Sequence, residues 1–215
     1  MIDVPSQGRA ISVITVNYKS MTLINELERL FSDAPVEYIV VDNSGDFVAA
    51  RPETKVVEAP GNIGFGRACN LGVENSDGDV VVFANPDIGL TAEAMSRYLA
   101  DSQVQPERAV RSPLIRDRRG QVVTLLKPGW AGLAFRRRPL DRKALSGETV
   151  PVVYVSGAFF ADHRQLFLEL GGFSSTVFLY GEDLDLCLRS EALGSPVFLL
   201  TSVEVRHSGG GSSGI

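Results

Sequence analysis

Residues 11–43 read ISVITVNYKSMTLINELERLFSDAPVEYIVVDN, and this stretch decides the fold. The runs ISVITVN at its start and YIVVDN at its end are rich in Val and Ile without polar alternation, which is typical of parallel strands covered on both faces. Residues 21–33 between them carry apolar side chains at helical spacing and predict a helix. A strand, a helix and a strand in this order predict an α/β fold with a parallel sheet.

The same alternation of strands and helices continues to about residue 104. Two further strands are expected at 55–59 and 79–87. Two further helices are expected from a glycine-rich turn to about residue 76 and over residues 91–102, with Thr91 as the N-cap.

Residues 108–150 have a different composition, with many arginines and with glycines and prolines that interrupt the pattern. We expect an irregular segment there, in which QVVTLL, at 121–126, is the only strand. Regular structure is expected to return afterwards, with a strand at 150–162, a helix at 163–170, a helix that begins near residue 182 and stops at Gly194, and a last strand at 197–205.

The length of 215 residues, with 44% hydrophobic and 22% charged residues, predicts one compact domain with a sizeable core. No apolar run approaches the roughly 20 residues that a membrane-spanning helix needs, and the N-terminus MIDVPSQGRA lacks the apolar core of a secretory signal. Cys69 and Cys187 show no metal-type spacing. A reduced protein of the cytoplasm is therefore expected.

Charge is segregated along the chain. Residues 107–143 hold eleven Lys and Arg against three Asp and Glu, a local charge of +8 in a chain whose net charge is −5. Such a segment could meet an anionic partner, either a phosphate-bearing substrate or an anionic membrane, or it could be a solvated loop. Aromatic and apolar side chains beside cationic ones favour the membrane contact; they are Trp130, Leu133 and Phe135, next to Arg136, Arg137 and Arg138.

The stretch GNIGFGRACN, at 61–70, is a glycine-rich turn that leads into a predicted helix. Such a turn can cradle a nucleotide phosphate or can be a tight bend. It follows the third predicted strand, not the first, and it lacks the G-x-G-x-x-G spacing. Both features disfavour a dinucleotide-dependent oxidoreductase.

Polar residues follow the predicted strands at the edge where open parallel sheets bind ligands. Asn17 ends the first strand, Asp42 and Asn43 end the second, and Asn85 and Asp87 end the fourth. A carboxylate at Asp42 could accept the imide N–H of a uracil or thymine ring, or residues 42–45 could be an ordinary turn. Asp87 could hold Mg²⁺ or Mn²⁺ together with substrate phosphates, or it could cap the turn NPD.

Two further groups could carry chemistry. Glu182 and Asp183 open a predicted helix, where the helix dipole favours carboxylates even without a function. A carboxylate at this position could instead accept the proton of an attacking hydroxyl group. His207 follows the last strand and could be a metal ligand or a surface residue.

Several stretches together resemble one family. In chain order they are ISVITVNYKS, VVDNSGD, PGNIGFGRACNLGV, VVFANPDI, VSGAFFADHRQLFLELGGF, FLYGEDLDLCLR and VRHSGGGS. They resemble the signature segments of family 2 inverting glycosyltransferases with the GT-A fold, and most closely the bacterial rhamnosyltransferase-like members. The resemblance covers residues 10–105 and 150–210, and the basic segment between them is poorly matched.

The resemblance implies a single domain over residues 1–215, with a Rossmann-like, mostly parallel sheet flanked by helices. Residues 10–105 would bind the nucleotide sugar, 106–149 would form the basic irregular segment, and 150–210 would bind the acceptor and carry the catalytic groups. The implied reaction moves a sugar, L-rhamnose by the closest resemblance, from a dTDP- or UDP-linked donor to a hydroxyl of a saccharide or of a polyprenyl-diphosphate-linked acceptor in cell wall polysaccharide synthesis.

The resemblance also implies a role for each matched residue. Val16, Asn17, Asp42 and Asn43 would hold the nucleoside. Asn62, Gly64, Arg67 and Asn70 would line the nucleotide-sugar pocket. Asp87 would contact Mg²⁺ or Mn²⁺ directly, His207 would complete the metal shell, and Asn85 stands where the DxD motif of the family has an acid. Asp183 would be the catalytic base, Glu182 would orient the acceptor, and Ser156 and Gly157 would lie near the sugar and the acceptor.

Partners and an alternative follow from the same resemblance. The expected partners are the nucleotide-sugar donor, the acceptor and an anionic membrane at the inner face of the plasma membrane; nucleic acid is not expected, and an oligomer stays open. Relatives often continue beyond HSGGGS, so acceptor handling is expected from the basic segment or from a partner. The alternative function is a catalytically inactive domain that binds a nucleotide sugar or acts as a scaffold.

Overall fold

The computed structural model describes residues 10–104, 108–126 and 149–209. Trp130, Leu133, Phe135 and the arginines at 136–138, on which the predicted membrane contact depends, lie outside these residues. Most of the expected basic segment therefore stays a prediction. Within the described ranges, no helix is long and apolar enough to cross a membrane.

The described residues form five helices and ten strands. The helices are α1 (Met21–Phe31), α2 (Phe65–Glu74), α3 (Ala92–Val104), α4 (Arg164–Glu169) and α5 (Glu182–Ala192). The strands are β1 (Ile11–Asn17), β2 (Val36–Asp42), β3 (Lys55–Glu58), β4 (Val80–Ala84), β5 (Ile88–Gly89), β6 (Val110–Arg116), β7 (Thr124–Leu126), β8 (Thr149–Val155), β9 (Phe159–His163) and β10 (Val197–His207).

One sheet contains all of these strands, in the order β3-β2-β1-β4-β9-β6-β10-β8-β7, with β5 paired to β10. The first half is parallel: β1 pairs with β2 and β4, and β2 pairs with β3. In the second half only β6 and β10 are parallel, and β9, β8, β7 and β5 run antiparallel to their neighbours. The predicted α/β fold is confirmed, with a mixed sheet in which the parallel part is the N-terminal half.

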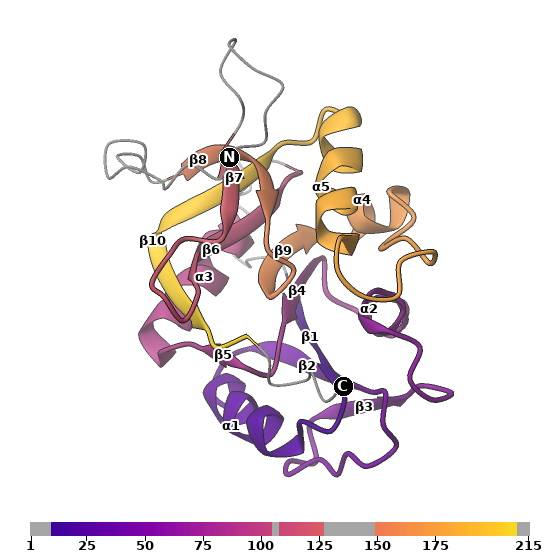
Figure 1. Cartoon of the computed structure of the whole chain (residues 1–215). Coiled ribbons are helices and arrows are strands. Elements are labelled where there is room, and N and C mark those ends of the chain that lie inside the picture. Colours follow the sequence, from indigo (N-terminus) through magenta and orange to yellow (C-terminus); the bar gives the residue numbers. More distant parts are fainter. Residues whose placement is uncertain (1–9, 105–107, 127–148, 210–215) are drawn as a thin grey trace, which may run out of the picture.

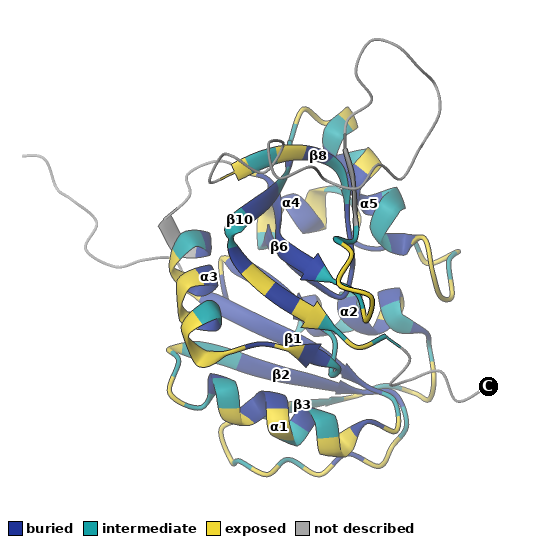
Figure 2. Ribbon diagram, turned by 60° about the vertical axis from the view of Figure 1, so that its left-hand side comes forward, coloured by how far each residue is buried: buried dark blue, intermediate teal, exposed yellow. Residues whose placement is uncertain are grey.

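Helices cover both faces of this sheet (Figure 1). On one face, side chains of α1 and α3 pack with those of the strands into one apolar cluster, and on the other face α2, α4 and α5 contribute to a second cluster. Figure 2 shows that the central strands are buried along most of their length. The uninterrupted runs of Val and Ile in the sequence agree with burial on both faces.

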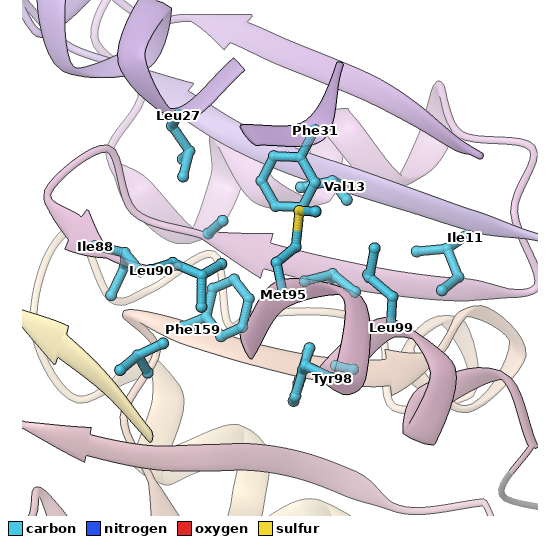
Figure 3. Close-up of a cluster of buried hydrophobic side chains, with 14 of the residues drawn as sticks. Ile11, Val13, Leu27, Phe31, Ile88, Leu90, Met95, Tyr98, Leu99 and Phe159 are labelled. Atoms are coloured by element: carbon cyan, nitrogen blue, oxygen red, sulfur yellow. The ribbon is translucent and has the colours of Figure 1, made fainter. Parts of the chain in front are cut away.

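The cluster under α3 fixes this helix to two parts of the sheet. Figure 3 shows Met95 of α3 pointing toward Phe31 of α1. Tyr98 is fully buried against Phe159, with ring centroids 4.9 Å apart, and its hydroxyl group donates to the backbone oxygen of Arg111 at 2.8 Å. Thr91 caps the helix as predicted, because its Oγ1 accepts the N–H of Ala94 at 3.1 Å.

Two predicted elements were wrong. Residues 108–150 were expected to contain a strand only at 121–126, but β6 lies within that range, between β9 and β10 in the sheet. Arg111 and Pro113 interrupt its apolar pattern, and Pro113 is accommodated where the pairing of β6 with β10 shifts register. The single strand expected at 150–162 is divided into β8 and β9 by a turn at residues 156–158.

An aromatic group on the opposite face provides a test of the core. Phe83 of β4 contacts Phe160, Phe167 and Phe173, with ring centroids 4.8, 5.0 and 5.4 Å apart. The substitution Phe83→Ala should lower the free energy of unfolding by about 3–5 kcal/mol, because it leaves a cavity among these rings. Denaturant unfolding measures this loss. Leu193→Ala, at a side chain that is 59% exposed, is the control and should change stability by less than about 0.5 kcal/mol.

Candidate active site

The carboxyl ends of β1 and β2 carry a buried hydrogen-bond network. Asn17 Nδ2 donates to Asp42 Oδ1 at 2.9 Å, and the backbone N–H groups of Ser44, Gly45 and Phe47 donate to the same carboxylate at 3.0, 3.0 and 2.8 Å. Burial raises the pKa of Asp42, but these hydrogen bonds outweigh burial and hold the pKa below its usual value. Asp42 therefore closes a turn as an ionised group. Its recognition of a pyrimidine base stays a prediction.

Asn43 and Asn62 hold the glycine-rich turn by hydrogen bonds to Gly64. Asn43 Nδ2 donates to the backbone oxygen of Gly64 at 3.2 Å, and Asn62 Oδ1 accepts the N–H of Gly64 at 3.1 Å. Gly64 has φ of +86°, and a Cβ at this position would lie 2.6 Å from the backbone oxygen of Phe178. Only glycine lets the turn approach the segment before α5 this closely. Its predicted role as a phosphate cradle stays a prediction. Val16, also predicted to hold the nucleoside, is buried in β1.

Arg67 and Asn70 of α2 form hydrogen bonds to the backbone of the segment that leads into α5. Asn70 exchanges two hydrogen bonds with the backbone of Phe173, donating at 2.9 Å and accepting at 2.8 Å. The Arg67 guanidinium group donates to the backbone oxygen of Ser175, at 3.0 Å from Nε. These contacts give both residues a structural role. Their predicted contact with a nucleotide sugar stays untested.

Asp183 lies in the first turn of α5 and is fixed by three donors. Its Oδ2 accepts the hydroxyl group of Tyr154 and the backbone N–H of Gly157, both at 2.8 Å, and its Oδ1 accepts the N–H of Leu184 at 2.8 Å. A Cβ on Gly157 would lie 3.2 Å from the Cβ of Asp183, so the turn between β8 and β9 approaches the acid closely. Ser156, in the same turn, accepts the N–H of Ala158 at 3.3 Å.

Asp87 and His207 are neighbours in space although 120 positions separate them in the chain. His207 Nε2 lies 3.1 Å from Asp87 Oδ1, and the backbone oxygen of Asp87 accepts the N–H of Ser208 at 3.2 Å. The antiparallel pairing of His207 with Ile88 brings them together. A carboxylate and an imidazole are suitable donors for a divalent cation. No group of three His, Cys, Asp or Glu side chains that could hold a metal occurs in the described part of the chain.

One turn connects the two acids. Asn85, two residues before Asp87, donates its N–H to the backbone oxygen of Ala158 at 2.8 Å. The neighbouring Gly157 donates its N–H to Asp183. The turn at residues 156–158 therefore lies between the end of β4 and the start of α5. The segment that carries Asp87 and the helix end that carries Asp183 therefore both bind this turn.

Glu182 differs from Asp183 in its surroundings. It is 6% exposed, and among the described residues its Oε2 has no hydrogen-bond partner. Burial raises the pKa of Glu182 above its usual value; a backbone N–H opposes the effect and the charge of Asp183 adds to it. A buried oxygen without a partner could accept a hydrogen bond from a ligand.

Tyr154 was not predicted as a site residue from the sequence. Nothing in the run VVYVSG indicates that its hydroxyl group contacts an acid 29 positions further on, because this contact depends on how β8 lies against α5. A tyrosine two residues before a Ser-Gly turn was the one available signal.

The comparisons with known proteins agree with the expected fold. The fold superposes on a mannosyltransferase from Pyrobaculum calidifontis in complex with GDP-Man and Mn²⁺, with a TM-score of 0.67 and 18% identity over 95% of this chain and 58% of that one. It also superposes on TarS of S. aureus in complex with UDP-GlcNAc, with a TM-score of 0.65 and 18% identity over 96% of this chain and 61% of that one.

The sequence is similar to curated glycosyltransferases. It is 27% identical to the N-acetylglucosaminyl-diphospho-decaprenol L-rhamnosyltransferase of Mycobacterium tuberculosis, over 86% of this chain and 70% of that protein. It is 28% identical to a low-salt glycan biosynthesis hexosyltransferase of Haloferax volcanii, over 84% of this chain and 61% of that protein. No protein-family model matches the chain. The predicted resemblance to glycosyltransferases with the GT-A fold is confirmed.

The buried Glu182 predicts a dependence of stability on pH. Because its folded pKa is raised, the carboxyl group contributes stability below its unfolded pKa of about 4.5 and loses that contribution as the pH rises through the folded pKa. Glu182→Gln removes this loss. The variant should gain stability relative to the wild type above about pH 4.5, by less than about 1.4 kcal/mol per pH unit, in denaturant unfolding.

Glu93→Gln is the matched control, since Glu93 is an exposed residue in the first turn of α3. The raised pKa of Glu182 would be contradicted by a stability difference for Glu182→Gln that does not change with pH, or by one that changes equally in the control.

Proposed function

We propose that this chain is an inverting glycosyltransferase that transfers a sugar from a nucleoside-diphosphate donor to an acceptor hydroxyl group, with Asp183 as the base. The observation that carries this proposal is that Asp183 and the segment leading to Asp87 both bind the turn at residues 156–158, Asp183 at Gly157 and Asn85 at Ala158. An inverting transfer needs the base and the departing diphosphate on opposite sides of the anomeric carbon. The two acids are suited to these two positions.

Asp183 removes the proton of the acceptor in a single displacement. The acceptor oxygen forms a bond to the anomeric carbon while the bond from that carbon to the diphosphate oxygen breaks. The hydroxyl proton passes to Asp183, and the electron pair leaves on the diphosphate. Because an alcohol is far less acidic than a carboxylic acid, the proton can move to Asp183 only as the new bond forms.

Asp87 and His207 would hold Mg²⁺ or Mn²⁺ at the diphosphate. A bound divalent ion supplies charge stabilisation for the leaving group. Without an ion, a carboxylate about 4 Å from a phosphate charge would be opposed by about 4 kcal/mol at an effective dielectric constant of about 20. The Mn²⁺ and GDP-Man of the mannosyltransferase complex support this part of the proposal.

For the substrates, we propose dTDP-L-rhamnose as the donor and a polyprenyl-diphosphate-linked sugar as the acceptor. The name of the mycobacterial relative supports both the sugar and the lipid carrier. Three apolar side chains directly before the Glu182-Asp183 pair, Phe178, Leu179 and Tyr180, are 58%, 44% and 78% exposed and could contact such a carrier. A location at the inner face of the plasma membrane would give the enzyme access to this acceptor.

The base is tested by Asp183→Asn. Turnover of dTDP-L-rhamnose with a short-chain polyprenyl-diphospho-N-acetylglucosamine should fall by about 10²- to 10⁴-fold, because the amide cannot take the proton. The stabilisation of the fold by dTDP, measured as a rise in Tm, should remain. Asp101→Asn in α3 removes the same charge far from this turn and should keep the wild-type rate.

Turnover by Asp183→Asn at the wild-type rate would exclude Asp183 as the base. Donor binding by the wild type without transfer to any acceptor would favour the alternative, an inactive nucleotide-sugar-binding domain. A larger Tm rise with UDP or GDP than with dTDP would exclude dTDP-L-rhamnose as the donor.

The metal is tested by a thermal titration. In the wild type, dTDP with Mn²⁺ should raise Tm more than dTDP with EDTA, and the difference should disappear in Asp87→Asn and weaken in His207→Ala. At a ligand concentration 100 times Kd, the stabilisation is about 2.7 kcal/mol. An equal Tm for the wild type with and without Mn²⁺ would refute the metal site.

A further inference from the structure

The contact between Tyr154 and Asp183 has no role in the reaction as described so far. Tyr154 lies near the end of β8, and α5 packs against this strand. Its hydroxyl oxygen is 2.8 Å from Asp183 Oδ2, and the side chain is half-buried. No other strand places a tyrosine hydroxyl on a carboxylate among the hydrogen bonds of the described residues.

The direction of this hydrogen bond is fixed by protonation. Burial, and after it the negative charge of Asp183, raise the pKa of Tyr154 above its usual value of about 10. The phenol therefore keeps its proton at neutral pH and donates to the carboxylate. A hydrogen bond to an ionised acceptor is among the stronger ones in proteins.

The two oxygens of Asp183 accept different numbers of hydrogen bonds from the three donors. Tyr154 and Gly157 both donate to Oδ2 and so occupy its two lone pairs. Oδ1 has the N–H of Leu184 as its donor among the described residues and keeps one lone pair. A proton that arrives from a substrate can be taken at Oδ1 without breaking any of these hydrogen bonds.

We propose that Tyr154 is a positioning residue for the base, which holds Oδ2 so that Oδ1 takes the proton of the acceptor hydroxyl group. This inference rests on the proposed function of Asp183. The hydroxyl of Tyr154 fixes the rotation of the carboxylate. The N–H of Gly157 alone would leave one lone pair of Oδ2 without a donor.

Two other titratable groups on α5, Glu182 and Cys187, interact with this pair. Asp162 on β9 and Glu191 on α5 interact with Cys187, and Cys69 on α2 interacts with Glu182. Burial raises the pKa of Cys187 to about 12 and raises that of Cys69 as well, so both thiols stay neutral at physiological pH. Glu182, whose pKa is also raised, is the neighbour that could titrate together with the base.

The test is the pH profile of Tyr154→Phe, which removes the hydroxyl and keeps the ring. We expect kcat to fall by about 10- to 100-fold and the acid limb of its pH profile to move upward by about one pH unit. KM for the donor and the Tm rise with dTDP should stay at their wild-type values. The same kcat–pH profiles should also be recorded with Glu182→Gln present in both proteins. This comparison separates any contribution of Glu182 to the acid limb from that of Tyr154.

The matched control is Tyr38→Phe, which removes a buried phenol hydroxyl that donates to Thr15 Oγ1 at 3.2 Å in another part of the sheet. It should keep the wild-type kcat and profile. A fall in kcat for Tyr154→Phe with an unmoved acid limb would indicate a structural role only, and an unchanged kcat would also overturn the proposal.

A wild-type chain without turnover would refute the proposed function, and the inference can then be tested separately. The ¹³C chemical shift of the Asp183 carboxyl group at neutral pH should differ between the wild type and Tyr154→Phe, because one hydrogen-bond donor is lost, and Tyr38→Phe should not change it. Equal chemical shifts in the wild type and in Tyr154→Phe would overturn the role of Tyr154.

Discussion

Two backbone hydrogen bonds at the turn between β8 and β9 hold the candidate site together. The N–H of Gly157 binds the carboxylate of Asp183, and the oxygen of Ala158 accepts the N–H of Asn85. The peptide groups of the turn have no rotamers to lose, so of the groups in these two contacts only the Asp183 carboxylate costs side-chain entropy to order. The β4–β9 pairing and the packing of α5 both support this turn.

Asparagines perform a similar task on the donor side. Asn17, Asn43 and Asn70 each donate and accept: Asn43 and Asn70 bind backbone groups of both kinds, whereas Asn17 accepts a backbone N–H and donates to the Asp42 carboxylate. Asn17 joins two strand ends, Asn43 supports the glycine turn, and Asn70 anchors the segment before α5. A carboxylate in their place could accept but not donate. The edge of the sheet is therefore arranged before any ligand arrives, which reduces the ordering that binding must impose.

The helices and strands that were predicted correctly are those whose signals lie within a few residues of one another in the chain. The strands β1 and β2, the helix between them and the start of α5 at Glu182 follow from apolar spacing and helix signals within a few residues. The strand β6 was missed because its interruptions make sense only in the folded sheet: Arg111 is buried beside Asp162, whose pKa burial raises to about 8. The role of Tyr154, and the contacts of Arg67 and Asn70 with residues 173–175, depend on partners 29 to 108 positions away.

The segment between α4 and α5 is fastened at both ends and exposed between them. Asn70 and Arg67 hold residues 173–175, α5 begins at residue 182, and Tyr180 stands 78% exposed with φ of +69°. Such an arrangement separates two requirements that an enzyme must meet together. Side chains at the tip can change while the fastened ends keep the carboxylate in place. Under the proposed function, acceptor preference would then diverge by point substitutions at the tip without a change in the reaction chemistry.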